Sequence, residues 1–214
     1  MALTVLALLG AGCTELQKKP PPVLAVASTP TKGEVWQGIA NPADRERIAN
    51  VSGAWAAGLA AARGRFAGAI REERALLRED AGLVRPAPTP GSYSCRLITL
   101  GATARGKPAL ERFKPFFCYV LTEGEVLTIV KQTGSQRPAG RLWDDDNSRR
   151  MVFLGSLALG SEEEVRAYGD DPRRDMAGIF ERIAPFRWRL VIPWPRDGSK
   201  LQVFELTPVP NQPE

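Results

Sequence analysis

The stretch 131–160 constrains the fold of this chain more than any other part of the sequence. It contains two segments that read as β-strands, residues 136–143 and 149–157, and an acidic turn, residues 144–148, lies between them. Asp, Asn and Ser favour a chain reversal because their short polar side chains hydrogen-bond to nearby backbone groups. The stretch therefore predicts a pair of strands joined by a turn, at the centre of a β-sheet.

Segments of the same kind recur along the second half of the chain. Glycine, proline and polar residues separate about eight of them: 93–100, 116–122, 125–132, 136–143, 149–157, 176–183, 187–192 and 201–206. Many short strands with turns between them favour a barrel or a sandwich over a parallel sheet. Segment 176–183 is also compatible with a short helix.

A helical region precedes the strands. Asn41 suits an N-cap and Pro42 suits the first helical position. Apolar residues then recur at steps of three and four, which predicts one buried helix face: Ile48, Val51, Trp55, Leu59, Ala62, Phe66 and Ile70. Gly64 is expected to break this region into two helices, over about 42–63 and 65–78.

The predicted fold class is therefore α+β. A helical hairpin, residues 41–80, is followed by an antiparallel β-barrel-like or sandwich domain of about eight strands over residues 92–207. Residues 41–207 are expected to form a single folded domain, and residues 208–214 a tail.

The N-terminus has the pattern of an export signal. The apolar run 2–11 is too short to span a bilayer and has the length of a signal-peptide core. The small residues before Cys13 resemble the lipobox of bacterial lipoproteins. The resemblance implies that residues 1–13 are a lipoprotein-type signal peptide, with cleavage before Cys13 and lipidation of its sulfur. A plain secretory signal is the alternative.

Residues 14–40 are rich in proline and polar residues, and they have no sustained apolar period. Such a segment buries too little surface to offset its ordering entropy, so we expect a tether. In lipoproteins generally, a residue other than Asp after the cysteine, here Thr14, favours the outer membrane. The predicted location is the cell envelope, lipid-anchored and facing the periplasm, with a soluble periplasmic protein as the alternative.

The chain contains no histidine. This excludes Ser-His-Asp and Cys-His nucleophilic machinery, His-ligated zinc and histidine acid–base chemistry. The net charge is +5, and basic residues alternate with acidic ones instead of concentrating on one element, which argues against a nucleic-acid partner. No motif indicates a cofactor, so none is predicted, and no catalytic residue is assigned.

Cys95 and Cys118 lie in neighbouring predicted strands. Because Cys13 is assigned to the anchor and the chain is predicted to be exported, a structural disulfide between these two is the simplest expectation. A redox-active pair is the alternative, but it usually has a Cys-x-x-Cys spacing, which is absent.

Three polar side chains of the central strand pair are candidates for ligand binding. Gln136, Arg137 and Arg141 follow a cluster of small residues, 133–135, and could line one mouth of a barrel. The structural alternative is that such side chains hold backbone groups of the turn. A phosphate-binding loop would need more glycines and a following helix, whereas a strand follows here.

The acidic residues offer two further possibilities. Asp144, Asp145, Asp146 and Asn147 could supply oxygen ligands to calcium, but the spacing of a calcium loop is absent, so a turn is favoured and no metal site is predicted. A two-carboxylate acid–base site could be drawn from Asp144, Asp146 and residues 162–164. Nothing in the sequence brings two of them to a defined separation.

Several short motifs together resemble a known family. They are 88–96 (PTPGSYSCR), 117–118 (FC), 134–138 (GSQRP), 152–155 (VFLG), 168–169 (YG), 175–178 (DMAG), 181–182 (ER) and 187–191 (RWRLV). Over about residues 43–206 they resemble domain of unknown function family 4893. The resemblance implies an exported bacterial protein with paired cysteines, and it carries over no catalytic residue. In architecture, the predicted barrel is also similar to small lipocalin-like barrels, including periplasmic protease inhibitors.

The absence of histidine, the absence of a catalytic motif and the expected anchor and tether favour a non-catalytic binding or interaction module of the bacterial cell envelope. Its partners would be the membrane, through the lipid anchor, and an envelope protein, polymer or small ligand. The alternatives are a periplasmic protease inhibitor of lipocalin-like barrel type and a carboxylate-dependent envelope hydrolase.

Overall fold

A computed structural model of the chain describes residues 28–102, 106–160, 162 and 165–210. The helices are α1 (Lys32–Ile39), α2 (Pro42–Ala49) and α3 (Val51–Glu72), with the short 3-10 helices η1 (Arg74–Leu77) and η2 (Glu79–Ala81). The strands are β1 (Gly91–Leu100), β2 (Leu110–Arg112), β3 (Phe116–Glu123), β4 (Val126–Lys131), β5 (Gln136–Asp144), β6 (Met151–Leu159), β7 (Asp175–Ala184), β8 (Arg187–Pro193) and β9 (Leu201–Pro208). Cys13 and the predicted signal peptide lie outside the described residues.

Eight strands close into an antiparallel barrel in the order β1-β3-β4-β5-β6-β7-β8-β9, and β9 pairs with β1. The extra strand β2 pairs with the C-terminal end of β1, beyond the part that pairs with β3. The predicted central hairpin is confirmed as β5 and β6, and segment 176–183 lies in a strand, β7. Of the two predicted β architectures, the barrel is therefore the one observed.

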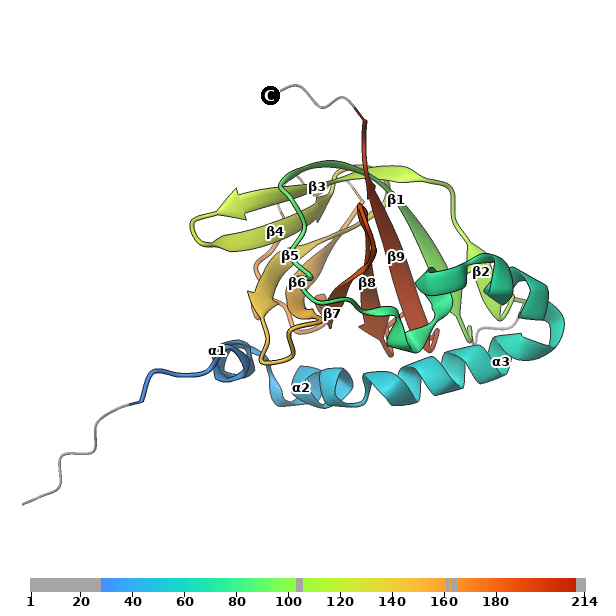
Figure 1. The fold of residues 1–214 in the computed structure, drawn as a ribbon, viewed down its shortest axis with the longest axis horizontal. Helices are drawn as coiled ribbons and strands as arrows, with labels where there is room; N and C mark the ends of the chain where they lie inside the picture. The colour runs from blue at the N-terminus through green and yellow to red at the C-terminus, as the bar shows by residue number, and fades with distance from the viewer. Residues whose placement is uncertain (1–27, 103–105, 161, 163–164, 211–214) are drawn as a thin grey trace, which may run out of the picture.

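Alternate residues of each strand point into the barrel, and the others point outward. On β6 to β9 both sets are mostly apolar, because the helices cover the outer face of this part of the barrel (Figure 1). The inward set forms one core with the disulfide. The outward set, which includes Val152, Ile179 and Val203, packs against Trp55 and Ala62 of α3.

The helical hairpin predicted for residues 41–80 is not confirmed. Helix α3 continues through Gly64, and the break lies instead at Asn50, between α2 and α3, which run along one side of the barrel (Figure 1). A glycine inside a helix costs only about 1 kcal/mol relative to alanine, which packing of a neighbouring apolar face offsets. The local distortion comes at Phe66, whose φ of −111° and ψ of 17° are not helical.

Helix α1 forms within the segment expected to be a tether. Thr31 and Glu34 make a reciprocal capping box at its start. The acidic turn after β5 holds the same end of the helix, since Thr31 donates a hydrogen bond to Asp146 (3.0 Å) and the indole of Trp36 donates one to Asp145 (3.1 Å). The acidic turn therefore has a structural role, and negative charge near a helix N-terminus is favourable.

A buried arginine joins the end of the helical region to the barrel. Arg189 points outward from β8, is fully buried and donates a hydrogen bond to Glu181 (2.7 Å). Its other nitrogens donate to the backbone carbonyls of Ala75, Leu76, Arg78 and Glu79, and its guanidinium lies 4.8 Å from the ring centroid of Trp55. One side chain thus satisfies carbonyls that end the helical region, and such groups are costly to bury without a partner.

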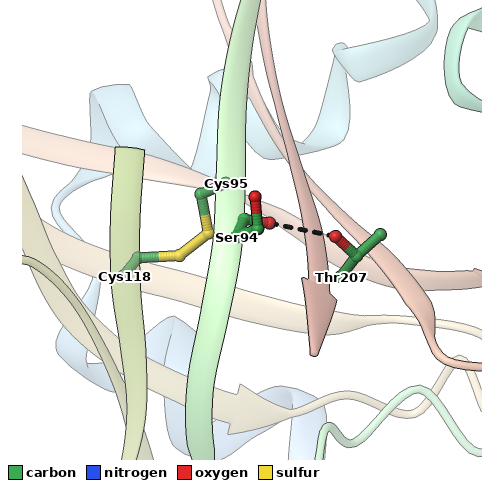
Figure 2. Close-up of a disulfide and its surroundings, with 4 residues drawn as sticks. All are labelled: Ser94, Cys95, Cys118 and Thr207. Atoms are coloured by element: carbon green, nitrogen blue, oxygen red, sulfur yellow. Dashed lines mark hydrogen bonds between the residues drawn. A yellow bond between two sulfur atoms is a disulfide. The ribbon is translucent and has the colours of Figure 1, made fainter. Parts of the chain in front are cut away.

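The disulfide between Cys95 and Cys118 is confirmed, with 6.1 Å between the two Cα atoms. It joins the neighbouring strands β1 and β3, and on the other side of β1 Thr207 of β9 donates a hydrogen bond to the carbonyl of Ser94 (Figure 2). Both cysteines lie in the inward core. β1 is therefore tied covalently to β3 and by hydrogen bonds to β9, where the barrel closes.

Replacing Arg189 by methionine should lower the free energy of unfolding by about 3–5 kcal/mol, because Glu181 would be left as a buried charge without its partner. Urea denaturation followed by circular dichroism measures this change. The exposed Arg63 of α3 supplies a matched control, since Arg63→Met should alter the free energy by less than about 0.5 kcal/mol. If Arg189→Met fails to fold, Arg189→Lys tests the same point. If the Arg189 and Arg63 variants lost equal amounts of free energy of unfolding, Arg189 would not be the residue that joins the helical region to the barrel.

Candidate functional site

The two ends of the barrel interior differ. At one end, where β1 and β8 begin, Tyr93 and Trp188 are buried and meet edge to face, with 5.8 Å between ring centroids. The hydroxyl of Tyr93 donates a hydrogen bond to the carbonyl of Thr89, and burial raises its pKa to about 12. Leu142, Met151 and other apolar side chains fill the remaining space. The barrel interior at this end is a packed core, and Leu142 and Met151 also border an open hollow of about 400 Å³ that extends to Lys32 and Val35 of α1.

The opposite end contains a pocket of about 280 Å³, called the mouth pocket below. Inward-pointing apolar side chains form much of its wall: Leu97 of β1, Leu157 and Leu159 of β6, Met176 of β7, Ile192 of β8 and Phe204 of β9. Beneath it lies a cavity of only about 20 Å³, bordered by the disulfide and Phe153. The ring of Phe153 helps to fill the barrel below the mouth pocket. It fits there because Gly140 and Gly155, which face each other across β5 and β6, have no side chains that would occupy the same space.

Most of the charged side chains that line the mouth pocket are engaged by a protein partner. Arg47 pairs with Asp44 (2.7 Å). Arg173 pairs with Asp171 (3.1 Å), and Arg174 pairs with Glu162 (2.5 Å). The guanidinium of Arg196 donates a hydrogen bond to the carbonyl of Pro172, and Asp197 accepts hydrogen bonds from Ser199 and Gln202.

Lys131, at the end of β4, differs from these groups. It borders both the mouth pocket and the small cavity beneath it, and its ammonium lies 4.3 Å from the ring centroid of Phe116. No carboxylate in the described part of the chain lies within ion-pair distance of it. Burial lowers the pKa of Lys131, and the nearby positive charge of Arg137 lowers it further. Sequence reasoning missed this residue, because nothing in a strand sequence shows which lysine points into a barrel.

Asp175, at the start of β7, is the second site residue that the sequence did not reveal. It lines the mouth pocket, is almost fully buried and accepts a hydrogen bond from the backbone nitrogen of Gly169 (2.9 Å). Burial raises its pKa, and the negative charges of Asp44 and Asp171 act in the same direction. The sequence did not mark this residue as part of a site, since its position at the mouth depends on how β6 and β7 pair.

The three predicted ligand-binding residues do not lie together. Gln136 lines the mouth pocket. Arg137 points to the other side of β5, where it donates hydrogen bonds to the carbonyls of Gly160 (2.6 Å) and Glu162. Arg137 therefore holds backbone groups, as in the structural alternative considered for these residues. Arg141 also points outward and pairs with Glu123 (3.3 Å). The period of two along a strand separates residue 136 from residues 137 and 141.

The predicted carboxylates lie in two separate places. Asp144 pairs with Lys32 (2.8 Å) and Asp146 accepts from Thr31, both beside α1, whereas Glu162 pairs with Arg174 beside the mouth. Hydrogen bonds from Arg174 and from the backbone nitrogen of Leu159 lower the pKa of Glu162. Residues 163 and 164 lie outside the described residues. Within the described residues, no group of three or more Cys, Asp or Glu side chains is placed to hold a metal ion.

None of the helices in the described residues is long and apolar enough to cross a membrane.

Replacing Lys131 by methionine should raise the free energy of unfolding at pH 7 by up to about 1 kcal/mol, because a charge that its surroundings disfavour is removed. The pKa of Lys131 in the folded protein lies below its ordinary value. The destabilisation that it causes is therefore complete below the folded-state pKa, and it disappears as pH rises toward the ordinary value. The difference in free energy of unfolding between Lys131→Met and the wild type, measured by urea denaturation, should therefore become smaller between pH 7 and pH 10.5. The exposed Lys114 provides the control, since Lys114→Met should show no such gap. A loss of stability in Lys131→Met would contradict this account.

Comparison with known proteins places the chain in a family. No curated protein and no solved structure is significantly similar to it. The sequence model of the family described as "Domain of unknown function (DUF4893)" matches residues 36–206. The matched residues run from Trp36 in α1 to Leu206 in β9. The resemblance noted in the sequence is thus confirmed, and the chain belongs to the DUF4893 family.

Proposed function

We propose that this protein is a non-catalytic binding module that holds a small amphipathic molecule in the mouth pocket. The observation that carries this proposal is the mouth pocket itself, which is about 280 Å³ in volume and is lined by inward-pointing apolar side chains of β1 and of β6 to β9. Pockets that bind small ligands are concave and mostly apolar, with a few polar groups that orient the ligand, and barrel mouths are a common place for them. Leu157, Met176 and Phe204 supply the apolar wall, and Lys131 and Gln136 supply polar groups.

The alternatives have less support. A carboxylate-dependent hydrolase needs two acidic side chains that converge on one substrate bond. Asp144 and Asp146 lie beside α1. Asp175 and Asp197 do line the mouth pocket together, but each is held by the protein: Asp175 accepts a hydrogen bond from the backbone nitrogen of Gly169, and Asp197 accepts hydrogen bonds from Ser199 and Gln202. The protease-inhibitor alternative rests on barrel architecture alone, which does not determine function.

We also propose that the module is exported and anchored by a lipid on Cys13, so that it faces the periplasm. The apolar run that ends at Cys13 supports this, and so does the disulfide, because disulfides persist mainly in oxidising compartments. A ligand-binding module held close to a membrane would meet amphipathic molecules released from it or inserted into it.

Binding in the mouth pocket can be tested with N-phenyl-1-naphthylamine, a neutral apolar dye whose fluorescence rises when it leaves water. The wild-type protein should bind it saturably. Leu157→Trp, which places a larger side chain in the pocket, should weaken binding by about tenfold or more, that is by at least about 1.4 kcal/mol.

Leu121→Trp is the matched control for this experiment, because Leu121 lies on β3, is 46% exposed and does not line the pocket. It should bind the dye as the wild type does. If the wild type does not bind the dye saturably, or if both variants lose affinity equally, the proposed function is wrong.

The anchor can be tested by mass spectrometry of the protein purified from the membranes of a bacterial host. The expected N-terminal peptide begins at Cys13 and carries a lipid mass. Cys13→Ser should move the protein from the membrane fraction to the soluble fraction, because a single lipidated residue supplies the attachment. An intact Met1 terminus with unmodified Cys13 would exclude the anchor.

A further inference from the structure

We infer that the ligand of the mouth pocket is a small monoanionic amphiphile, such as an aliphatic carboxylate, and that its negative group pairs with Lys131 while its apolar part covers the wall formed by Leu97, Met176 and Phe204. This inference rests on the proposed binding function and names the class of ligand. Gln136, on the strand next to Lys131, supplies an amide that can donate a hydrogen bond to the same group.

Within the described residues, Lys131 has no carboxylate partner. Among the described cationic residues that line the mouth pocket, it is the one with no oxygen partner, since the four arginines bind carboxylates or a carbonyl. Its ammonium instead faces the ring of Phe116 at 4.3 Å. A partly buried charge is costly unless it is paired and hydrogen-bonded, so a bound anion would offset a cost already present in the folded protein.

The charged groups that line the pocket are unevenly placed. Asp175 and Asp197 lie on β7 and on the segment between β8 and β9, whereas Lys131 and Gln136 lie on β4 and β5. The four arginines of the lining already bind carboxylates or a carbonyl. Lys131 is therefore the cation that remains for one negative group, and the two acids disfavour a negative group on their own side of the pocket.

The size of the space limits the ligand. The cavity beneath the mouth pocket holds about 20 Å³, because Phe116, Phe153 and Phe204 fill the barrel at that level. A ligand body thus stays within the upper volume of about 280 Å³ instead of passing through the barrel. This volume lies just below the range for ligand pockets, about 300–1,000 Å³, which favours a short amphiphile over a long-chain lipid.

The experiment compares three unbranched compounds that have eight carbon atoms each and carry different polar groups: octanoate, octan-1-ol and octylamine. Each displaces N-phenyl-1-naphthylamine from the protein at pH 7, and the affinity of each variant for the dye is measured first. We expect octanoate to bind the wild type at least about tenfold more tightly than octanol, and octylamine to bind most weakly. This difference corresponds to at least about 1.4 kcal/mol, as expected for one charge-assisted interaction.

Variants assign the preference to Lys131. Lys131→Met should bring the affinities for octanoate and octanol to within about twofold of each other, whereas Lys131→Arg should keep most of the preference because it retains the charge. Lys200→Met is the matched control, since Lys200 lies over the ring of Trp194 (5.4 Å) and does not line the pocket. It should leave the preference unchanged.

The outcomes separate this inference from the function on which it rests. Equal affinity for octanoate and octanol in the wild type, with saturable dye binding, would overturn the inference and leave the pocket as a binding site for neutral molecules. A preference for octanoate that survives in Lys131→Met would also overturn the assignment to Lys131. No saturable binding of the dye or of any of the three compounds would overturn both the proposed function and the inference.

Discussion

The pairing of β1 with β9 is the interaction on which the rest of the structure depends. It joins the first and last strands of the barrel along most of their length, from Tyr93 with Pro208 to Leu100 with Leu201. Closure leaves no unpaired edge in the barrel and divides the side chains of every strand into an inward and an outward set. An enclosed interior, and with it a pocket at one end, exists only because this pairing closes the sheet.

Closure also creates the outer surface on which the helices pack. The apolar outward residues of β6 to β9 would face water without α2, α3 and the 3-10 helices that follow α3. Arg189 aligns this layer, because its guanidinium can reach Glu181 and four backbone carbonyls only when the 3-10 helices lie directly over β8. A buried ion pair contributes little net stability compared with apolar packing, and geometric specificity is a role that such pairs serve in several proteins.

The mouth pocket contains two charged groups whose interactions within the described residues are incomplete. Lys131 faces an aromatic ring without a carboxylate partner, and Asp175 is buried with one backbone donor. On the outer face of the barrel, by contrast, Glu73, Arg96 and Glu205 form a network of ion pairs. Natural proteins commonly accept such local losses of stability at sites that bind ligands.

The sequence by itself determined the local elements, because they depend on spacing along the chain. Alternation and turn residues predicted the strands and the central hairpin, and the positions of Cys95 and Cys118 in neighbouring strands predicted the disulfide. The helix around Trp55 was predicted, but its path was not, since contact with the barrel keeps α3 continuous through Gly64. Helix α1 was missed, because Trp36 and Thr31 are held by Asp145 and Asp146, more than a hundred positions away.

Only the tertiary structure decided which side chains form the site. Gln136 was predicted and lines the pocket, whereas Arg137 and Arg141 lie on the opposite side of the same strand. Lys131 and Asp175 come from strands that are not neighbours, and their proximity to one pocket follows from closure of the barrel. The physical reason is that a strand sequence reveals two alternating faces without showing which one is enclosed. That choice is made by pairings between residues far apart in the chain.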